Sequence, residues 1–320
     1  MLKGRLKHYC FATIKPLAFF WIFYGTAQYV TERMVMAEIY PAQNIFHKKK
    51  LNQKKRVRIA LEKALAFQDK VQLEPIVLKK NGMAFHGWIL FDPKQKENGK
   101  WVLQATGNKA AVEEYIPRIQ ERYALVGYNT LLINNPGVGE SQGTSTPKTI
   151  GQVQELALSY LENTVGAKKI VLAGHSLGGA AIGQAILQHT FKPNIQYLVI
   201  QQMTFGKLSK VAKQMKPSLK ALIKPVVYWT GLEMDTTAAS RKLAELNIEE
   251  YIINKKIAAK YLHDGVIAGR VSLGHSLHKL GISHLKTTHY PNFSLDFSHN
   301  CAKYLDLTAK IIDSWDQKEV

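Results

Sequence analysis

The stretch from Lys169 to Gly179, KIVLAGHSLGG, is the most informative segment of the chain. The apolar residues 170–173 predict a buried strand, and the small residues that follow Gly179 predict a helix. Ser176 stands between the two, inside a G-x-S-x-G motif. A serine on such a sharp strand-to-helix turn needs glycine neighbours, because side chains there would clash, and the helix N-terminus behind it stabilises negative charge. Ser176 is therefore the candidate nucleophile.

The letters GHSL occur a second time, from Gly274 to Leu277. In this copy His278 stands where the second glycine belongs, and no apolar strand precedes the motif. We therefore expect Ser276 to be an ordinary loop or helix-capping residue without a catalytic role.

From about Glu74, short apolar runs alternate with helical stretches, as in a mostly parallel sheet covered by helices. The predicted strands are residues 76–79, 85–91, 100–106, 130–134, 169–173, 197–200, 251–254 and 285–289. The predicted helices are residues 113–125, 150–164, 178–189 and 300–315. The pattern predicts an α/β domain with an eight-stranded, mostly parallel sheet flanked by helices.

Three further segments match the landmarks of a known superfamily in order. Residues 101–108, WVLQATGN, resemble the strand and loop that supply part of an oxyanion hole, and residues 134–141, NNPGVGES, resemble the D-x-R-G-x-G-x-S turn. Over residues 74–315 the chain thus resembles the α/β-hydrolase superfamily. Residues 142–144 and 146–147 extend the likeness to membrane-associated depalmitoylase-like and lysophospholipase-like hydrolases. The chain as a whole also resembles effector-type hydrolases of intracellular bacteria. Two positions depart from the pattern: Thr106 replaces a histidine, and Asn134-Asn135-Pro136 replaces Asp-x-Arg.

The resemblance implies a Ser-His-Asp triad that works through an acyl-enzyme, without metal or cofactor. It places one oxyanion donor on the backbone amide of Leu177, which follows the serine. The second donor lies in the loop after Gly107, on the amide of Asn108, with Lys109 as the substitute.

In this fold the triad order is Ser, acid, His, so both partners must follow Ser176. The segment His263-Asp264-Gly265-Val266-Ile267 resembles the D-x-V-I loop of the superfamily, which favours Asp264 as the acid. Asp235 comes before the relevant strand and Asp296 comes after the last one. A turn or helix-capping role is the alternative for Asp264.

The general base must lie between the final strand and the last helix, where its imidazole reaches both serine and aspartate. His299 fits this position. His289, at the end of the last predicted strand, is the alternate.

The composition of residues 1–73 predicts a membrane-associating, basic helical extension that is separate from the catalytic domain. A basic stretch precedes an apolar, aromatic run of 16 residues from Tyr9 to Tyr24. A spanning helix needs roughly 20 apolar residues, so the run matches an interfacial anchor or a signal-peptide core, and the protein is expected to be membrane-associated, with secretion or translocation also compatible. A helix packed on the domain is the alternative for residues 1–30. Two isolated cysteines are compatible with a reducing compartment.

The formal net charge of +19 calls for a polyanionic neighbour. Fourteen Lys/Arg and four Asp/Glu lie between Met1 and Lys70. Residues 74–320 form the predicted catalytic domain, with a lid at 206–248. The lid carries lysines at helical spacing, Lys207, Lys210, Lys213, Lys216, Lys220 and Lys224, opposite an apolar face that Pro217 interrupts. An ordinary surface helix with a solvated lysine face is equally compatible with this pattern.

Two classes of function fit the sequence. The first is a serine esterase, lipase-like, that cleaves an acyl ester or thioester at an anionic membrane surface. The second is a membrane-associated effector or binding module that keeps the fold without efficient catalysis. Nucleic-acid binding is disfavoured, because no nucleic-acid motif accompanies the charge. Neither the identity of the acyl group nor the oligomeric state follows from the sequence.

Overall fold

The computed structural model describes residues 47–66, 70–108, 111–215, 217, 220–257, 260–282, 288–289 and 303–318. The predicted anchor at residues 1–30, the alternative donor Lys109 and the candidate base His299 lie outside these ranges.

The strands form an eight-stranded sheet in the order β1-β2-β4-β3-β5-β6-β7-β10. Their bounds are β1 Gln72–Lys80, β2 Met83–Phe91, β3 Lys100–Ala105, β4 Asn129–Ile133, β5 Lys169–His175, β6 Gln196–Gln202, β7 Glu249–Ile253 and β10 Thr288–His289. The β1·β2 and β2·β4 pairs are antiparallel, and every other pair in this sheet is parallel. A two-stranded hairpin, β8 (Lys256–Ile257) with β9 (Lys260–Tyr261), stands apart. The predicted fold class is confirmed.

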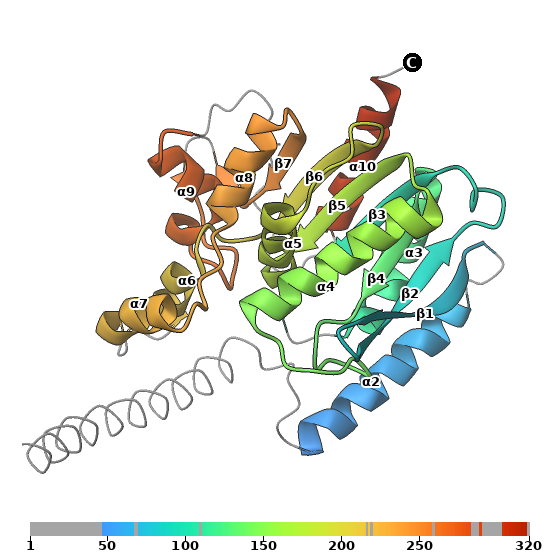
Figure 1. The fold of residues 1–320 in the computed structure, drawn as a ribbon, viewed down its shortest axis with the longest axis horizontal. Helices are drawn as coiled ribbons and strands as arrows, with labels where there is room; N and C mark the ends of the chain where they lie inside the picture. Colours follow the sequence, from blue (N-terminus) through green and yellow to red (C-terminus); the bar gives the residue numbers. More distant parts are fainter. Residues whose placement is uncertain are drawn as a thin grey trace, which may run out of the picture.

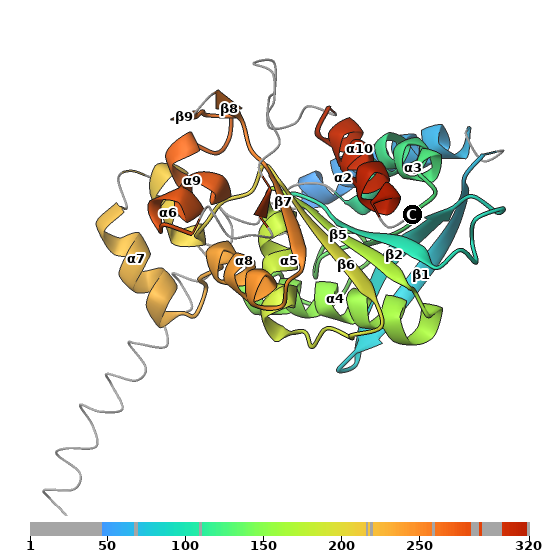
Figure 2. The same ribbon diagram turned by 90° about the horizontal axis from the view of Figure 1, so that it is seen from above.

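Helices cover both faces of the sheet, as Figures 1 and 2 show. The helices are α2 His47–Leu65, α3 Ile116–Leu125, α4 Pro147–Tyr160, α5 Leu177–Gln188, α6 Leu208–Met215, α7 Lys220–Trp229, α8 Thr236–Glu245, α9 Leu273–Lys279 and α10 Lys303–Gln317. One apolar core joins α4, α5 and α8 to the sheet, and another joins α2, α3 and α10 to its other face. Successive side chains of β5 point to opposite faces of the sheet and so contribute to both cores. Ile170 and Leu172 enter the first core, and Val171 and Ala173 enter the second.

The helix α2 packs on this domain. Ala60 and Ala64 are buried, and the Arg56 guanidinium lies 2.7 Å from the Glu114 carboxylate in the turn before α3. The strand β1 follows directly and pairs with β2 along its whole length. The part of α2 from Arg56 to Ala64 thus contacts the domain, while the domain boundary at residue 73 stays a prediction.

The predicted lid, residues 206–248, contains α6 and α7, with Pro217 between them where the sequence predicts a break, and also α8. Both α6 and α7 lie at the end of the molecule opposite β1 and β2 (Figures 1 and 2). The helix α8 packs on the main sheet instead, because its Ala239 and Leu243 enter the core that α5 shares with the sheet. The part that stands off the sheet therefore ends before α8.

Candidate functional site

Ser176 lies on the turn between β5 and α5, at the carboxyl edge of the parallel strands. Its backbone has φ 55° and ψ −118°, a conformation that non-glycine residues rarely adopt and that costs of order 1–3 kcal/mol. Hydrogen bonds hold this geometry. The Ser176 N–H donates to the Gln202 carbonyl at 2.8 Å, and the Ser176 carbonyl accepts from the Thr204 hydroxyl at 2.7 Å. The half-buried side chain is thereby presented at the turn.

The glycines around Ser176 are required by packing. A Cβ on Gly174 would lie 2.5 Å from the Gly179 Cα, and a Cβ on Gly178 would lie 2.3 Å from the Ala105 carbonyl oxygen. Since real Cβ contacts are longer, neither position admits a side chain without displacement of the backbone. The first turn of α5 therefore sits directly against β5 and β3.

The loop after β3 reaches the same place. A Cβ on Gly107 would lie 3.4 Å from the Ser176 Cβ and 3.0 Å from His175 Nδ1, so the loop backbone passes close to the serine. The Tyr115 hydroxyl accepts a hydrogen bond from the Gly107 N–H, and burial raises the pKa of this tyrosine, so it stays neutral. The half-buried Asn108 follows. The structure thus brings the two segments proposed to supply oxyanion donors together at the turn.

Sequence reasoning did not identify Thr204 and Tyr115 as supports of this turn. Thr204 lies two residues beyond the end of β6, and Tyr115 precedes α3. Neither belongs to a motif, since a single threonine or tyrosine in a loop has no distinctive spacing. Only the folded arrangement shows that their hydroxyls fix the two backbone segments next to Ser176.

Asn134 explains one departure from the superfamily pattern. Its Oδ1 accepts from the Val112 N–H at 2.9 Å, and its Nδ2 donates to the Glu113 carboxylate at 3.0 Å. An aspartate could accept but not donate, so it would face Glu113 with like charge. Asparagine thus suits this pairing and anchors the start of the segment that carries Tyr115.

Asp264 lies in the connection between β7 and β10, with only 4% of its surface exposed. Its Oδ1 accepts from the backbone N–H groups of Val266 at 2.9 Å and Ile267 at 2.7 Å. The turn role that the sequence offered as an alternative is therefore present. Ile267 packs in the same apolar cluster as Leu177, which connects this loop to the first turn of α5.

The last helix begins beside the elbow. The Tyr304 ring, on the first turn of α10, stacks on His175 with ring centroids 4.5 Å apart and an interplanar angle of 5°. His175 directly precedes Ser176. The start of α10 is thereby fixed next to the candidate nucleophile.

His289 lies next to the amino end of β7, away from the carboxyl ends of the strands where Ser176 lies. It pairs with Tyr251 across β7 and β10, stacks on that ring, and has its Nε2 3.6 Å from the Glu249 carboxylate. Glu249 is the first residue of β7. The last residue of this strand, Ile253, is in register with Gln202 of β6, which in turn pairs with His175, the residue before Ser176. At about 3.3 Å per residue, the level of Ser176 is roughly 16 Å from Glu249.

Ser276, the serine of the second GHSL copy, lies inside α9 with 1% of its surface exposed. The helix is capped by Ser272 instead, so the expected loop or capping position is wrong for Ser276. A Cβ on Gly206 would lie only 2.3 Å from the Ser276 hydroxyl oxygen. Ser276 fills space in the core and is not presented to a substrate.

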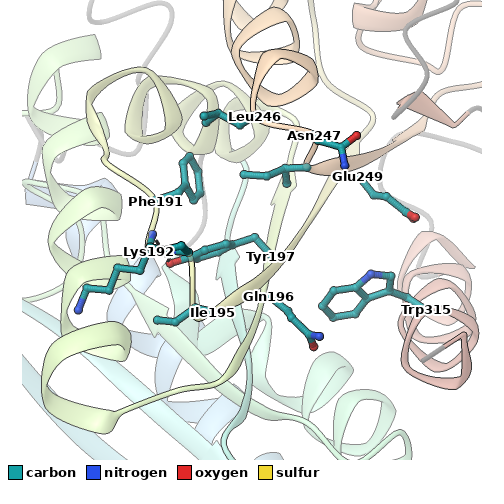
Figure 3. Close-up of a pocket in the computed structure, with 11 residues that line it drawn as sticks. Phe191, Lys192, Ile195, Gln196, Tyr197, Leu246, Asn247, Glu249 and Trp315 are labelled. Carbon is teal, nitrogen blue, oxygen red and sulfur yellow. Dashed lines mark hydrogen bonds between the residues drawn. The ribbon is translucent and has the colours of Figure 1, made fainter. Parts of the chain in front are cut away.

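A pocket of about 480 Å³ lies at the opposite edge from Ser176 (Figure 3). Phe191, Tyr197, Asn247 and Trp315 contribute to its lining. Residues 191–197 lead into β6 and residue 247 leads into β7, so the pocket lies at the amino ends of these strands. It has no contact with the turn that carries Ser176.

Within the described ranges, no group of three or more His, Cys, Asp or Glu side chains could hold a metal ion. Among the helices in those same ranges, none combines the length and the apolar character needed to cross a bilayer.

Three solved structures with the same fold carry the names of hydrolases or esterases. An α/β-hydrolase from Vibrio vulnificus has a TM-score of 0.60 and 16% identity, covering 89% of this chain and 93% of that one. The esterase Pf2001 from Pyrococcus furiosus has a TM-score of 0.53 and 14% identity, covering 77% and 92%. Est1E from Butyrivibrio proteoclasticus, with ferulic acid bound, has a TM-score of 0.52 and 15% identity, covering 76% and 98%. At these identities the likeness establishes the α/β-hydrolase fold.

Sequence relatives add a short match and a long one. A segment of 84 residues is 33% identical to the multifunctional-autoprocessing repeats-in-toxin protein of Vibrio cholerae, and this match spans 26% of the chain but 2% of the toxin. The long match runs over residues 8–303 and covers the strands, the elbow and the loop of Asp264 described above. By this match the chain belongs to the family described as Chlamydia CHLPS protein (DUF818).

Proposed function

We propose that this chain is a serine hydrolase that cleaves an acyl ester or thioester through an acyl-enzyme, with Ser176 as the nucleophile. The observation that carries the proposal is the strained backbone of Ser176, φ 55° and ψ −118°, on the turn between β5 and α5. Strain of this kind persists only where the surroundings impose it, and here hydrogen bonds with Gln202 and Thr204 hold the backbone of Ser176. The names of the structural relatives favour the same class of reaction.

The proposed reaction has two steps. Ser176 Oγ attacks the acyl carbon and its proton passes to His299; the C–O or C–S bond then breaks, and His299 returns the proton to the leaving alcohol or thiol. Water next attacks the acyl-enzyme with His299 as base, which releases the acid and restores Ser176. Asp264 orients the imidazole, and the backbone N–H groups of Leu177 and Asn108 stabilise the oxyanion.

The start of α10 supports His299 as the base. His299 precedes Tyr304, whose ring stacks on His175, by five positions, and an extended chain of that length reaches at most about 18 Å. His289 is a poorer candidate, because its ring contacts Glu249 at the amino end of β7.

Asp264 is supported by its place in the topology and by its burial. It follows β7, the strand second from β5 in the sheet, and precedes β10, which matches the order Ser, acid, His. A buried carboxylate needs hydrogen-bond donors, and the Val266 and Ile267 amides supply two of them to one oxygen. This fixes the carboxylate in one orientation.

We further propose that the substrate is a lipid or a lipid-bearing molecule at a membrane. The excess of basic residues favours an anionic surface, and about half of it lies in residues 1–70. The lid helices support this, because α6 and α7 share one apolar cluster with Leu177, the residue after the nucleophile. A lid in contact with the elbow is well placed to select the acyl group.

The proposal is tested by hydrolysis of short p-nitrophenyl esters. The Ser176→Ala variant should lose activity by a factor on the order of 10³ to 10⁶. Ser276→Ala is the matched control, since it removes a buried hydroxyl from the same four-letter motif. Turnover that survives in Ser176→Ala, or that is lost only in Ser276→Ala, would overturn the assignment. A folded wild-type protein that neither hydrolyses these esters nor reacts with a fluorophosphonate probe would favour a non-catalytic module.

A further inference from the structure

The lid is a strongly basic part of the molecule. Between Gly206 and Leu232 there are six lysines and no acidic residue. The ammonium group of Lys207 is used within the fold, because it lies 2.7 Å from the Asp235 carboxylate at the start of α8. Lys224 is exposed on α7, one turn before the last two residues of the helix.

The apolar face of the lid is already occupied. Leu208 and Val211 of α6, with Ile223 and Val227 of α7, are all less than 9% exposed. They pack in one cluster with Leu177 of the elbow helix, together with residues of the Asp264 loop. These four side chains therefore face the candidate site and are not available to a membrane.

The end of α7 is different. Tyr228 is 81% exposed and Trp229 is 66% exposed, side by side on the last turn of the helix. Lys224 lies one turn before Tyr228, so a cation and two aromatic rings share the end of one helix. This end lies at the periphery of the molecule, on the side opposite β1 and β2 (Figures 1 and 2).

Tyrosine and tryptophan side chains are enriched at the interface between lipid and water, where an apolar ring and a polar group are both accommodated. Exposed lysines next to such rings add attraction to anionic headgroups. A segment with no acidic residue has charge complementary to an anionic bilayer across its whole length. A lipid surface thus matches both features of the helix end.

We propose that the end of α7, formed by Lys224, Tyr228 and Trp229, docks the protein on an anionic lipid bilayer. This inference rests on the proposed function in one respect, since it identifies the surface from which the substrate is taken. Docking at this point places the helices that cover Leu177 against the membrane, and an acyl chain leaving the bilayer would meet the lid next to Ser176.

The test uses the full chain carrying Ser176→Ala, so that lipids are not consumed. Co-sedimentation is measured with vesicles of phosphatidylcholine, with and without phosphatidylserine. The double change Tyr228→Ser with Trp229→Ser should weaken binding to the anionic vesicles by about tenfold or more, and Lys224→Glu should weaken it too. The matched control is Leu125→Ser on α3, which removes a side chain that is 78% exposed elsewhere.

A second readout reports on the helix end directly. Vesicles with brominated acyl chains should quench the fluorescence of Trp229, obtained as the difference between the full chain and its Trp229→Phe variant. This readout holds even if residues 1–46 also bind lipid.

Unquenched Trp229, or equal binding by the double variant and the Leu125→Ser control, would overturn the docking proposal. So would an oligomer in solution that dissociates in the double variant, because the aromatic pair would then bind another copy of the chain. Hydrolysis of a soluble ester, measured in the chain with Ser176 intact, separates the two proposals: turnover without docking refutes only the docking, and docking without turnover refutes only the hydrolase.

Discussion

Burial of Glu250 predicts a pH dependence of stability. This residue of β7 is fully buried; its Oε1 accepts from the Ser240 hydroxyl at 3.0 Å, and its Oε2 is buried with no hydrogen-bond partner. Desolvation raises the pKa of Glu250 from its ordinary 4.5 to about 7. Between these two pH values the folded state holds a proton that the unfolded state has released. Stability therefore falls as pH rises from 4.5 to about 7, and at about 1.4 kcal/mol per pH unit the loss is of order 3 kcal/mol.

The change Glu250→Gln keeps the shape and removes the titration. Urea denaturation at pH 5 and pH 8 gives the free energy of unfolding of both proteins. We expect Glu250→Gln to gain stability relative to the wild type at pH 8, and to gain much less or nothing at pH 5. Glu245→Gln, at an exposed position of α8, is the control and should be neutral at both. Equal differences at the two pH values would refute the reasoning.

Three further outcomes follow from the site. Thr204→Val removes the hydroxyl that donates to the Ser176 carbonyl, so kcat for a soluble ester should fall by roughly tenfold while KM changes little, and Thr204→Ser should restore it; unchanged kcat in the valine variant would show that the bond is dispensable. In steady-state assays His299→Ala should abolish turnover and His289→Ala should retain it, and the reverse result would move the general base to His289. Gly178→Ala would place a Cβ 2.3 Å from a carbonyl oxygen of β3, so thermal unfolding should show a clear loss of stability, and an unchanged Tm would contradict the tight packing there.

Much of the fold follows from local pattern. Each of the buried strands β3, β4 and β5 contains a run of at least three apolar residues, and their predicted ends agree with the structure to within about two residues. The predicted helix at residues 150–164 is an α-helix to Tyr160 followed by a π-helical turn at Leu161–Val165, which periodicity does not distinguish. The order of the strands in the sheet was not predicted, because apolar runs alone do not specify which strands are neighbours.

The site divides in a similar way. Ser176 and its glycines form a contiguous motif with a strict steric requirement, so sequence alone identifies them. Thr204, Tyr115 and Asn134 act across the fold, through hydrogen bonds between distant segments, and no spacing identifies them. The lid shows a further limit: its helical periodicity predicts an apolar face but not that this face is buried against Leu177.

Labelling with a fluorophosphonate probe tests the central claim most directly. The probe bonds covalently to an activated serine, and digestion with mass spectrometry then locates the adduct. The account predicts a single adduct on the peptide that contains Ser176, lost in Ser176→Ala and retained in Ser276→Ala. An adduct on any other serine, or labelling that persists in Ser176→Ala, would contradict it.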